Sequence, residues 1–391
     1  AFTTGAQTLY VAGNWNHTAG TFTCGTSTII FDGVSSTITS SSSGTKSFYN
    51  LVVDDDVTLG SALDVNGSLT INNAKSLTTS ASNFAISVAG SWTNNGTFTP
   101  GTGTVTFDGA TAATLTTGGT GVGKAFYNLT INKSAAGNTV DMGADDLDVN
   151  QSFSLTRGTF NANDRTLNVF RHWTTNAANG VFNAGTSTVV FDGSGTQTIN
   201  SGGTGVGKAF YNITVNKSAS TATLSSYAIE IAGNFTLSAG TWDVSASNFD
   251  MYIGGNWSNS ATFTPRSGTV YFNGSGAQLI TTGGTGAGKP FYNVVVDKPD
   301  EIATLAGNID INGSFTITNG TWDISTSNYA MYITGDWTNN GNFNAQSGTV
   351  TLDGTIASVN INTGGVGASK AFNNLTINKG NSANAINLGS D

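Results

Sequence analysis

Short runs in which apolar and polar residues alternate recur along the chain. One stretch holds three of them, at 314–317, 320–324 and 329–333. Alternation with a period of two is typical of β-strands that bury one face. The residues between the runs are mostly Gly, Asn, Ser and Asp, which favour turns. The pattern therefore predicts about three short strands, joined by tight turns, in every 20-odd residues.

Two markers show that the chain is a repeat. A tryptophan recurs at intervals of 77 to 84 residues, at Trp15, Trp92, Trp173, Trp257 and Trp337. A Phe-Tyr-Asn motif recurs with nearly the same period, at Phe48, Phe126, Phe210 and Phe291, and in degenerate form at Phe372. These markers define five copies of a unit of about 81 residues, at approximately 1–88, 89–170, 171–254, 255–334 and 335–391, the last incomplete.

A finer period inside the unit identifies the architecture. Phe235 precedes Trp257 by 22 residues, and Phe315 precedes Trp337 by the same distance. About four turns of 20-odd residues thus make one unit, which predicts an all-β fold, a parallel right-handed β-solenoid (β-helix) continuous over 1–391. About 20 coils at a rise of about 4.8 Å would form a rod of about 95 Å. The repeated tryptophans then continue an aromatic core file, although exposed aromatics could instead form a sugar-stacking platform.

A string of five immunoglobulin-like sandwiches is the competing fold, because about 80 residues is close to the size of a small sandwich. The 22-residue sub-period and the lack of Pro-rich or charged linkers both favour the solenoid.

The composition excludes several fold classes and several kinds of partner. Charged residues make up only 9 %, and Glu occurs only at Glu230 and Glu301, which excludes a helical bundle. Cys24 is the single cysteine, so no internal disulfide scaffold can form. The net charge of −9 argues against nucleic acid as a partner, and no apolar run is long enough for a membrane-spanning helix.

A glycine-rich motif imitates a phosphate-binding loop. Residues 118–124, 202–208 and 283–289 each fit G-x-x-x-x-G-K. A functional loop needs a following Ser or Thr and a helix, whereas Ala or Pro and a strand-like run follow here. The motif therefore predicts a structural turn, with no cofactor.

Lysines follow these loops in pairs nine residues apart. The first members, Lys124, Lys208, Lys289 and Lys370, form a candidate surface contact row for an anionic glycan or a neighbouring filament. The favoured interpretation is that both members of each pair are solubilising lysines that protect exposed strands from lateral aggregation.

Carboxylates gather at 54–56 and 145–148 but in different repeats, and arginines concentrate at 157–171. An enzyme acting on glycosidic bonds needs carboxylates facing one groove. Only two histidines occur, so no metal site is expected. We therefore expect no catalytic residues, and keep a carbohydrate-binding or carbohydrate-cleaving β-helix, with Asp164 and Arg165 as its residues to test, as the alternative.

The runs at 97–109 and 126–131 resemble repeats of very large bacterial surface proteins, the right-handed β-helices of the filamentous-haemagglutinin and autotransporter type. That resemblance implies an extracellular or cell-surface protein without enzymatic activity, either the shaft of a fibre or adhesin or the subunit of an end-to-end filament. Both ends of the sequence are in repeat register, which predicts continuation of the chain or head-to-tail contact with copies of itself, and surface glycans are further candidate partners.

Overall fold

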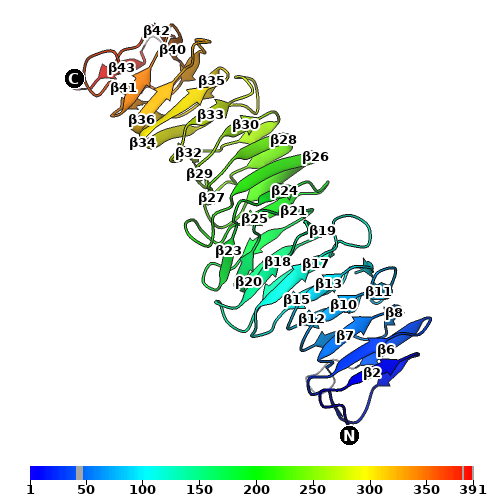
Figure 1. Ribbon diagram of the computed structural model, residues 1–391. Helices are drawn as coiled ribbons and strands as arrows, with labels where there is room; N and C mark the ends of the chain where they lie inside the picture. Colours follow the sequence, from blue (N-terminus) through cyan, green and yellow to red (C-terminus); the bar gives the residue numbers. More distant parts are fainter. Residues whose placement is uncertain (41–46, 381–382, 390–391) are drawn as a thin grey trace. The chain divides into compact units, whose positions relative to one another are not determined.

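The computed structural model describes residues 1–40, 47–380 and 383–389. Within these residues every regular element is a β-strand, and each pairs in parallel with strands about one coil away (Figure 1). The strands form a β-solenoid of about 17 turns. The expected fold class, an all-β parallel β-solenoid, is therefore confirmed.

The chain divides into two compact units, each defined by the contacts among its own residues. Unit 1 contains Ala1–Val189 and Val206–Lys208, and unit 2 contains Val190–Gly205 and Ala209–Asp391. Strand β24 (Thr188–Phe191) lies at the division.

Three stacks of parallel strands build unit 1. Stack A contains β2 (Thr8–Val11), β5 (Thr28–Phe31), β7 (Asn50–Val53), β10 (Leu69–Ile71), β13 (Trp92–Asn94), β16 (Ala113–Thr116), β18 (Thr139–Met142), the second half of β20 (Phe153–Asn161) and β23 (Gly180–Asn183). Stack B contains β3 (Trp15–His17), β6 (Ser36–Ser40), β8 (Asp56–Leu59), β11 (Ser76–Thr78) and β14 (Thr97–Thr99). Stack C contains β9 (Leu63–Val65), β12 (Ile86–Val88), β15 (Thr104–Phe107), β17 (Asn128–Asn132), the first half of β20 and β22 (Trp173–Thr175). Two further pairs are β1 (Phe2–Thr3) with β4 (Phe22–Thr23), and β19 (Leu147–Val149) with β21 (Thr166–Val169).

Unit 2 continues the same architecture with four stacks. Stack D contains β25 (Gln197–Asn200), the second halves of β26 (Asn212–Leu224) and β28 (Phe235–Asp243), and β31 (Thr262–Thr264). Stack E contains the first halves of β26 and β28, β30 (Trp257–Asn259), β33 (Gln278–Thr281), the second halves of β34 (Asn293–Leu305) and β36 (Phe315–Asp323), and β39 (Asn342–Asn344). Stack F contains β27 (Ile229–Ile231), β29 (Met251–Ile253), β32 (Thr269–Phe272), the first halves of β34 and β36, β38 (Trp337–Asn339), β41 (Ser358–Asn362) and β43 (Ala385–Leu388). Stack G contains β35 (Ile309–Ile311), β37 (Met331–Ile333), β40 (Thr349–Leu352) and β42 (Asn374–Ile377).

Register explains the alternating sequence pattern. In stack A, Trp92 pairs with Leu69 on one side and with Leu115 on the other, and all three are fully buried. Their neighbours Thr70 and Thr93 also pair with each other, but on the outward face. A side-chain bond often braces the turns, as where Asn256 donates its backbone N–H to Oδ1 of Asn234, one coil earlier, over 2.8 Å. Each coil thus supplies the apolar cover and the hydrogen-bond partners that the next coil lacks.

The 81-residue repeat does not contain a whole number of turns. Each turn of the solenoid has three positions, and a strand or a loop occupies each of them. Between Trp92 on β13 and Trp173 on β22, the chain advances by eleven such positions. Each repeat is therefore one position short of four turns, so equivalent residues of successive repeats fall in different stacks. Trp15 lies in stack B, Trp92 in stack A and Trp173 in stack C, whereas Trp257 and Trp337 lie in stacks E and F. The shortfall of a third of a turn per repeat, together with the incomplete fifth repeat, explains why the turns number about 17 instead of about 20.

Candidate functional site

The glycine-rich loops are the most chemically distinctive feature of the repeat, and each one occupies the position of a missing strand. Stack B ends at β14, where Phe98 donates its backbone N–H to the carbonyl oxygen of Gly123 over 2.8 Å. Phe182 at the end of stack A donates to Gly207 in the same way, also over 2.8 Å. In unit 2, Phe263 and Phe343 donate to Gly288 and Ser369, over 2.7 and 2.8 Å. In these four repeats, a loop therefore terminates one strand stack.

The Phe-Tyr-Asn motif follows the loop and begins the next stack. Phe48, Phe126, Phe210 and Phe291 are fully buried, and each forms an isolated parallel bridge with Val65, Val149, Ile231 or Ile311. The degenerate Phe372 is half-buried. The motif phenylalanine also packs on the repeat tryptophan, with ring centroids 4.8 to 5.3 Å apart in the pairs Trp15–Phe48, Trp92–Phe126, Trp257–Phe291 and Trp337–Phe372. Trp92, Trp173, Trp257 and Trp337 are fully buried and Trp15 is half-buried, so four of the five present no surface to a sugar.

The first lysine of each pair fastens the loop to the coil beneath it. Lys124 donates from Nζ to the carbonyl oxygen of Asn94 over 3.0 Å. Lys208 donates to Asn176 over 2.7 Å and also to Gly180. In unit 2, Lys289 donates to Ala261 over 2.8 Å, and Lys370 donates to Asn339 over 3.2 Å. Burial lowers the pKa of Lys208 and Lys289, because desolvation disfavours the ammonium form.

Within each unit, the lysines of the predicted contact row lie on loops of different stacks. In unit 1, Lys124 lies on the loop that terminates stack B, and Lys208 lies on the loop that terminates stack A. In unit 2, Lys289 and Lys370 belong to the loops that end stacks D and E. The physical reason is the repeat of eleven positions, which moves each successive loop to another stack.

The second lysine of the pair is part of the core, so the expectation of a solubilising surface lysine is wrong for Lys133, Lys217 and Lys298. All three are at most 1 % exposed. Lys298 donates from Nζ to the carbonyl oxygens of Gly274 (2.6 Å) and Gly276 (2.7 Å) and to Oε1 of Gln278 (2.7 Å). Three acceptors around one ammonium match its three N–H donors.

The same clamp recurs with changes between repeats. Lys217 donates to the carbonyl oxygen of Gly193 and to Oε1 of Gln197, each over 2.7 Å. Lys133 donates to the carbonyl oxygen of Ala89 over 2.9 Å. The first repeat carries Asp55 in place of the lysine, and this buried carboxylate accepts from the hydroxyl of Ser36 over 2.6 Å. Desolvation lowers the pKa of Lys298 to about 8.

A bound phosphate would need the backbone N–H groups of the glycine-rich loops as donors, but several of these groups already donate to carboxylates of the chain itself. Gly121 donates its backbone N–H to Oδ2 of Asp148, and Gly205 donates to Oε2 of Glu230, each over 2.6 Å. Gly118 donates to Oδ2 of Asp145 over 3.0 Å. The negative charge of the carboxylates also repels an incoming anion, so this arrangement is unsuited to phosphate.

The acidic clusters serve the same inter-coil bonding. At 145–148, Oδ1 of Asp146 accepts from the backbone N–H of Thr166 over 2.8 Å, and Oδ1 of Asp148 accepts from Nδ2 of Asn168 over 2.7 Å. At 54–56, Oδ1 of Asp54 accepts from Asn72 and Oδ1 of Asp56 from Ser76. In the part of the chain that the structure describes, no three His, Cys, Asp or Glu side chains gather in a way that could hold a metal ion.

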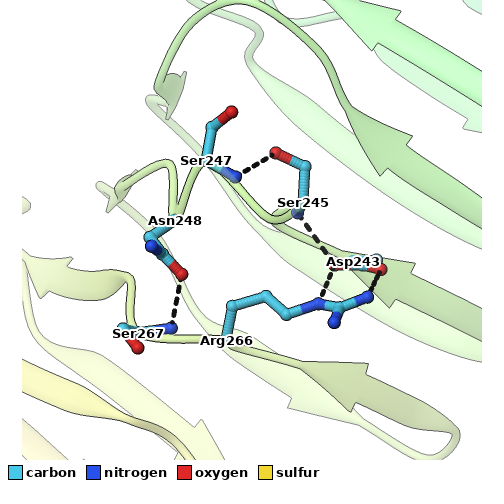
Figure 2. Close-up of polar contacts among 6 residues, drawn as sticks. All are labelled: Asp243, Ser245, Ser247, Asn248, Arg266 and Ser267. Carbon is cyan, nitrogen blue, oxygen red and sulfur yellow. Dashed lines mark hydrogen bonds and ion pairs between the residues drawn. The ribbon is translucent and has the colours of Figure 1, made fainter.

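Two ion pairs show what the arginines do. Arg165 contacts the adjacent Asp164 at 3.2 Å and donates from Nε to the carbonyl oxygen of Gly143, one coil away. In unit 2, Arg266 donates from Nε (2.9 Å) and Nη2 (2.6 Å) to the two oxygens of Asp243 (Figure 2). The bidentate pair was not predicted from the sequence, where nothing except the spacing of about one coil points to it. Hydrogen bonding to Arg266 holds the pKa of Asp243 below its usual value.

One acidic group stands out electrostatically. Burial, together with repulsion from Asp353, raises the pKa of Asp310 on β35 to about 6.

Comparisons of the chain with protein-family models, with curated proteins and with solved structures found no match. No helix among the described residues is long and apolar enough to cross a bilayer.

Proposed function

We propose that the chain is an extracellular structural scaffold without catalytic activity, either the shaft of a surface fibre or adhesin or the subunit of an end-to-end filament. The observation that carries this proposal is that the charged side chains of the repeat form hydrogen bonds that connect one coil to another. The loop lysines, the buried lysines and the clustered aspartates all have partners within the chain, most of them one coil away. Side chains engaged in this way strengthen the stack but are not arranged to attack a substrate.

The parallel β-solenoid is compatible with the β-helix fold of the filamentous-haemagglutinin and autotransporter proteins that the repeats resemble. Membership of that group, and the cell-surface location it implies, are part of the proposal. In such a scaffold each peptide plane bonds along the stacking direction, so many hydrogen bonds share a load applied along it.

Carbohydrate binding or cleavage receives less support. A glycosidase needs one carboxylic acid and one carboxylate facing a groove at a defined separation. Asp146, Asp148 and Arg165 instead make bonds that brace neighbouring coils. An exposed aromatic platform is also missing from the repeat tryptophans, four of which are buried.

Single-molecule stretching tests the scaffold proposal. The protein is held by its two ends, and the extension is recorded as the force rises. We expect long plateaus of high resistance, followed by stepwise release of coils. Gradual extension without resistance, as for an unfolded chain, would overturn the proposal. A separate polysaccharide-cleavage assay tests the alternative function. It compares the wild type with the double variant Asp164→Asn, Arg165→Gln, and a cleavage activity of the wild type that this variant loses would establish the alternative.

A further inference from the structure

Three tryptophans of the repeat bury an indole N–H for which the described residues offer no hydrogen-bond acceptor. They are fully buried, and they are Trp92, Trp257 and Trp337. The other fully buried indoles each have an acceptor. Nε1 of Trp173 donates to Oγ1 of Thr175 over 3.0 Å. Two further indoles donate to methionine sulfur over 3.3 Å, in the pairs Trp242–Met251 and Trp322–Met331. A buried donor without an acceptor is costly, so the three exceptions require a partner of another kind.

The indole ring packs in the same way in four repeats, against one phenylalanine. The ring centroids of Trp173 and Phe182 are 4.9 Å apart, with an interplanar angle of 71°. The equivalent distances are 4.8 to 5.0 Å and the angles 70 to 74° in the pairs Trp92–Phe98, Trp257–Phe263 and Trp337–Phe343. Alternate residues of a strand point to the same side. The shared packing therefore places Nε1 beside the side chain two residues later, as it does at Thr175.

An asparagine takes the place of this threonine where the indole has no protein partner. Asn94 is fully buried, and its Nδ2 donates to the carbonyl oxygen of Gly123 over 2.9 Å, whereas its Oδ1 has no donor among the described residues. In Asn339, Nδ2 likewise donates to the carbonyl oxygen of Ser369 over 3.1 Å, and Oδ1 has no donor in the described part of the chain. The loop carbonyl fixes the orientation of each amide, because exchanging Oδ1 with Nδ2 would oppose two oxygen atoms.

Two of the four repeats thus combine a buried donor and a buried acceptor that both lack a protein partner. The third repeat is complete, since the hydroxyl of Thr175 accepts from the indole. In the fourth repeat only the indole lacks a partner among the described residues, because Oδ1 of Asn259 accepts from the backbone N–H of Ala261 over 3.0 Å. The two combinations are Trp92 with Asn94 and Trp337 with Asn339.

We propose that one water molecule binds inside the core at each of these two places, where it accepts a hydrogen bond from Nε1 of the tryptophan and donates one to Oδ1 of the asparagine. A cation could not accept from the indole, and a halide ion could not donate to the amide oxygen. Water does both, and a buried water typically bonds to about two to four polar groups. The bound water connects the aromatic core, through the asparagine, to the carbonyl oxygen of the glycine-rich loop. It therefore gives these loops an anchor besides their lysine.

A crystal structure at a resolution that shows ordered waters tests the inference. We expect one density peak within hydrogen-bond distance of both Nε1 of Trp92 and Oδ1 of Asn94, an equivalent peak at Trp337, and none between Trp173 and Thr175. Nuclear magnetic resonance of the protein with ¹⁵N-labelled tryptophan gives a second readout in solution. The indole N–H of Trp92 should show a nuclear Overhauser cross-peak to water that the indole N–H of Trp173 lacks.

The third repeat supplies the matched variant. Asn94→Thr gives the second repeat the residue of the third, so the new hydroxyl should accept directly from the indole of Trp92, and the water should disappear from this site while the one at Trp337 remains. Absence of a water from either wild-type site, or a water that persists at Trp92 in Asn94→Thr, would overturn the inference. The wild-type structure decides the question even where the variant does not fold. Neither result bears on the scaffold proposal, which stretching tests separately.

Discussion

The ammonium of Lys298 lies 2.7 Å from Oε1 of Gln278, in the core of unit 2 and 20 residues away along the chain. Both side chains are at most 2 % exposed. Lysine is rarely buried unless its charge is fully paired, and here the partners are two backbone carbonyls and an amide oxygen. The lysine thus joins the turn after β32 to the strand that follows the glycine-rich loop.

We expect Lys298→Met to lower the free energy of unfolding by roughly 3 kcal/mol, because the substitution leaves buried acceptors without a donor. Chemical denaturation measures the effect. In a double-mutant cycle, adding Gln278→Leu to Lys298→Met should cost much less than Gln278→Leu alone. Strictly additive losses would mean that the two side chains do not act as a clamp.

The buried lysine also makes stability depend on pH. Its pKa is about 8 in the folded state, below the usual value for lysine of about 10.4. Between these two values the unfolded chain binds more protons than the folded chain, so the free energy of unfolding should rise as the pH increases from about 8 to about 10. The Lys298→Met variant should lack this part of the rise. Identical pH profiles for the two proteins would contradict the assignment.

Asp310 produces a pH dependence of the opposite sign at lower pH. Its pKa of about 6 in the folded state lies above the usual aspartate value of about 3.9. The folded chain therefore binds more protons than the unfolded chain between these values, and stability should fall as the pH rises from about 4 to about 6. We expect Asp310→Asn to be more stable than the wild type at pH 7, with thermal melting as the measurement. Destabilisation at pH 7 would show that the charged carboxylate is favourable.

The turn at Arg266 permits a test from the internal repeats. Arg266 has a φ of +52°; the corresponding residue is a glycine with positive φ in three other repeats, such as Gly101 at +54°, and Gln346 at +46° in the fifth. We expect Arg266→Ala to cost about 1–2 kcal/mol, because it keeps the left-handed strain and removes the bond to Asp243. Arg266→Gly should cost less than Arg266→Ala, since glycine adopts this conformation freely. Denaturant titration of the two variants compares them directly, and the reverse order would refute the backbone strain assigned to this position.

The loop lysine should control local opening. Lys208 donates to two carbonyl oxygens of the coil beneath. Its replacement in Lys208→Met should make residues 202–208 more susceptible to proteolysis, while the midpoint of global unfolding changes little, because the loop lies outside the core. Lys75→Met serves as the control. Equal cleavage of the loop in both variants would show that Lys208 does not fasten it.

The sequence predicted the stack because every coil repeats the same local rule. Spacings such as Phe315 to Trp337 correspond to pairs of neighbours in the register, and alternation separated inward from outward residues. Two features of the structure could not be predicted from the sequence. The shift of equivalent residues between stacks requires counting every strand, including runs of only three residues. The burial of Lys298 contradicts the usual preference of lysine for the surface, and the only signal was that Lys217 and Lys298 each follow a Gln by 20 residues.

The parallel register of the coils positions the core, the buried lysines and the loops, and disulfide formation tests this register most directly. In a Cys24→Ser background, Thr70→Cys with Thr93→Cys places two thiols on paired, outward positions of neighbouring coils, about 4.8 Å apart at Cα. Thr70→Cys with Thr78→Cys joins residues that are closer in sequence but lie in stacks A and B. Quantitative mass spectrometry under mild oxidation should find an intramolecular disulfide in the first variant and none in the second. A reduced first variant, or a disulfide in the second, would contradict the stacked-coil account.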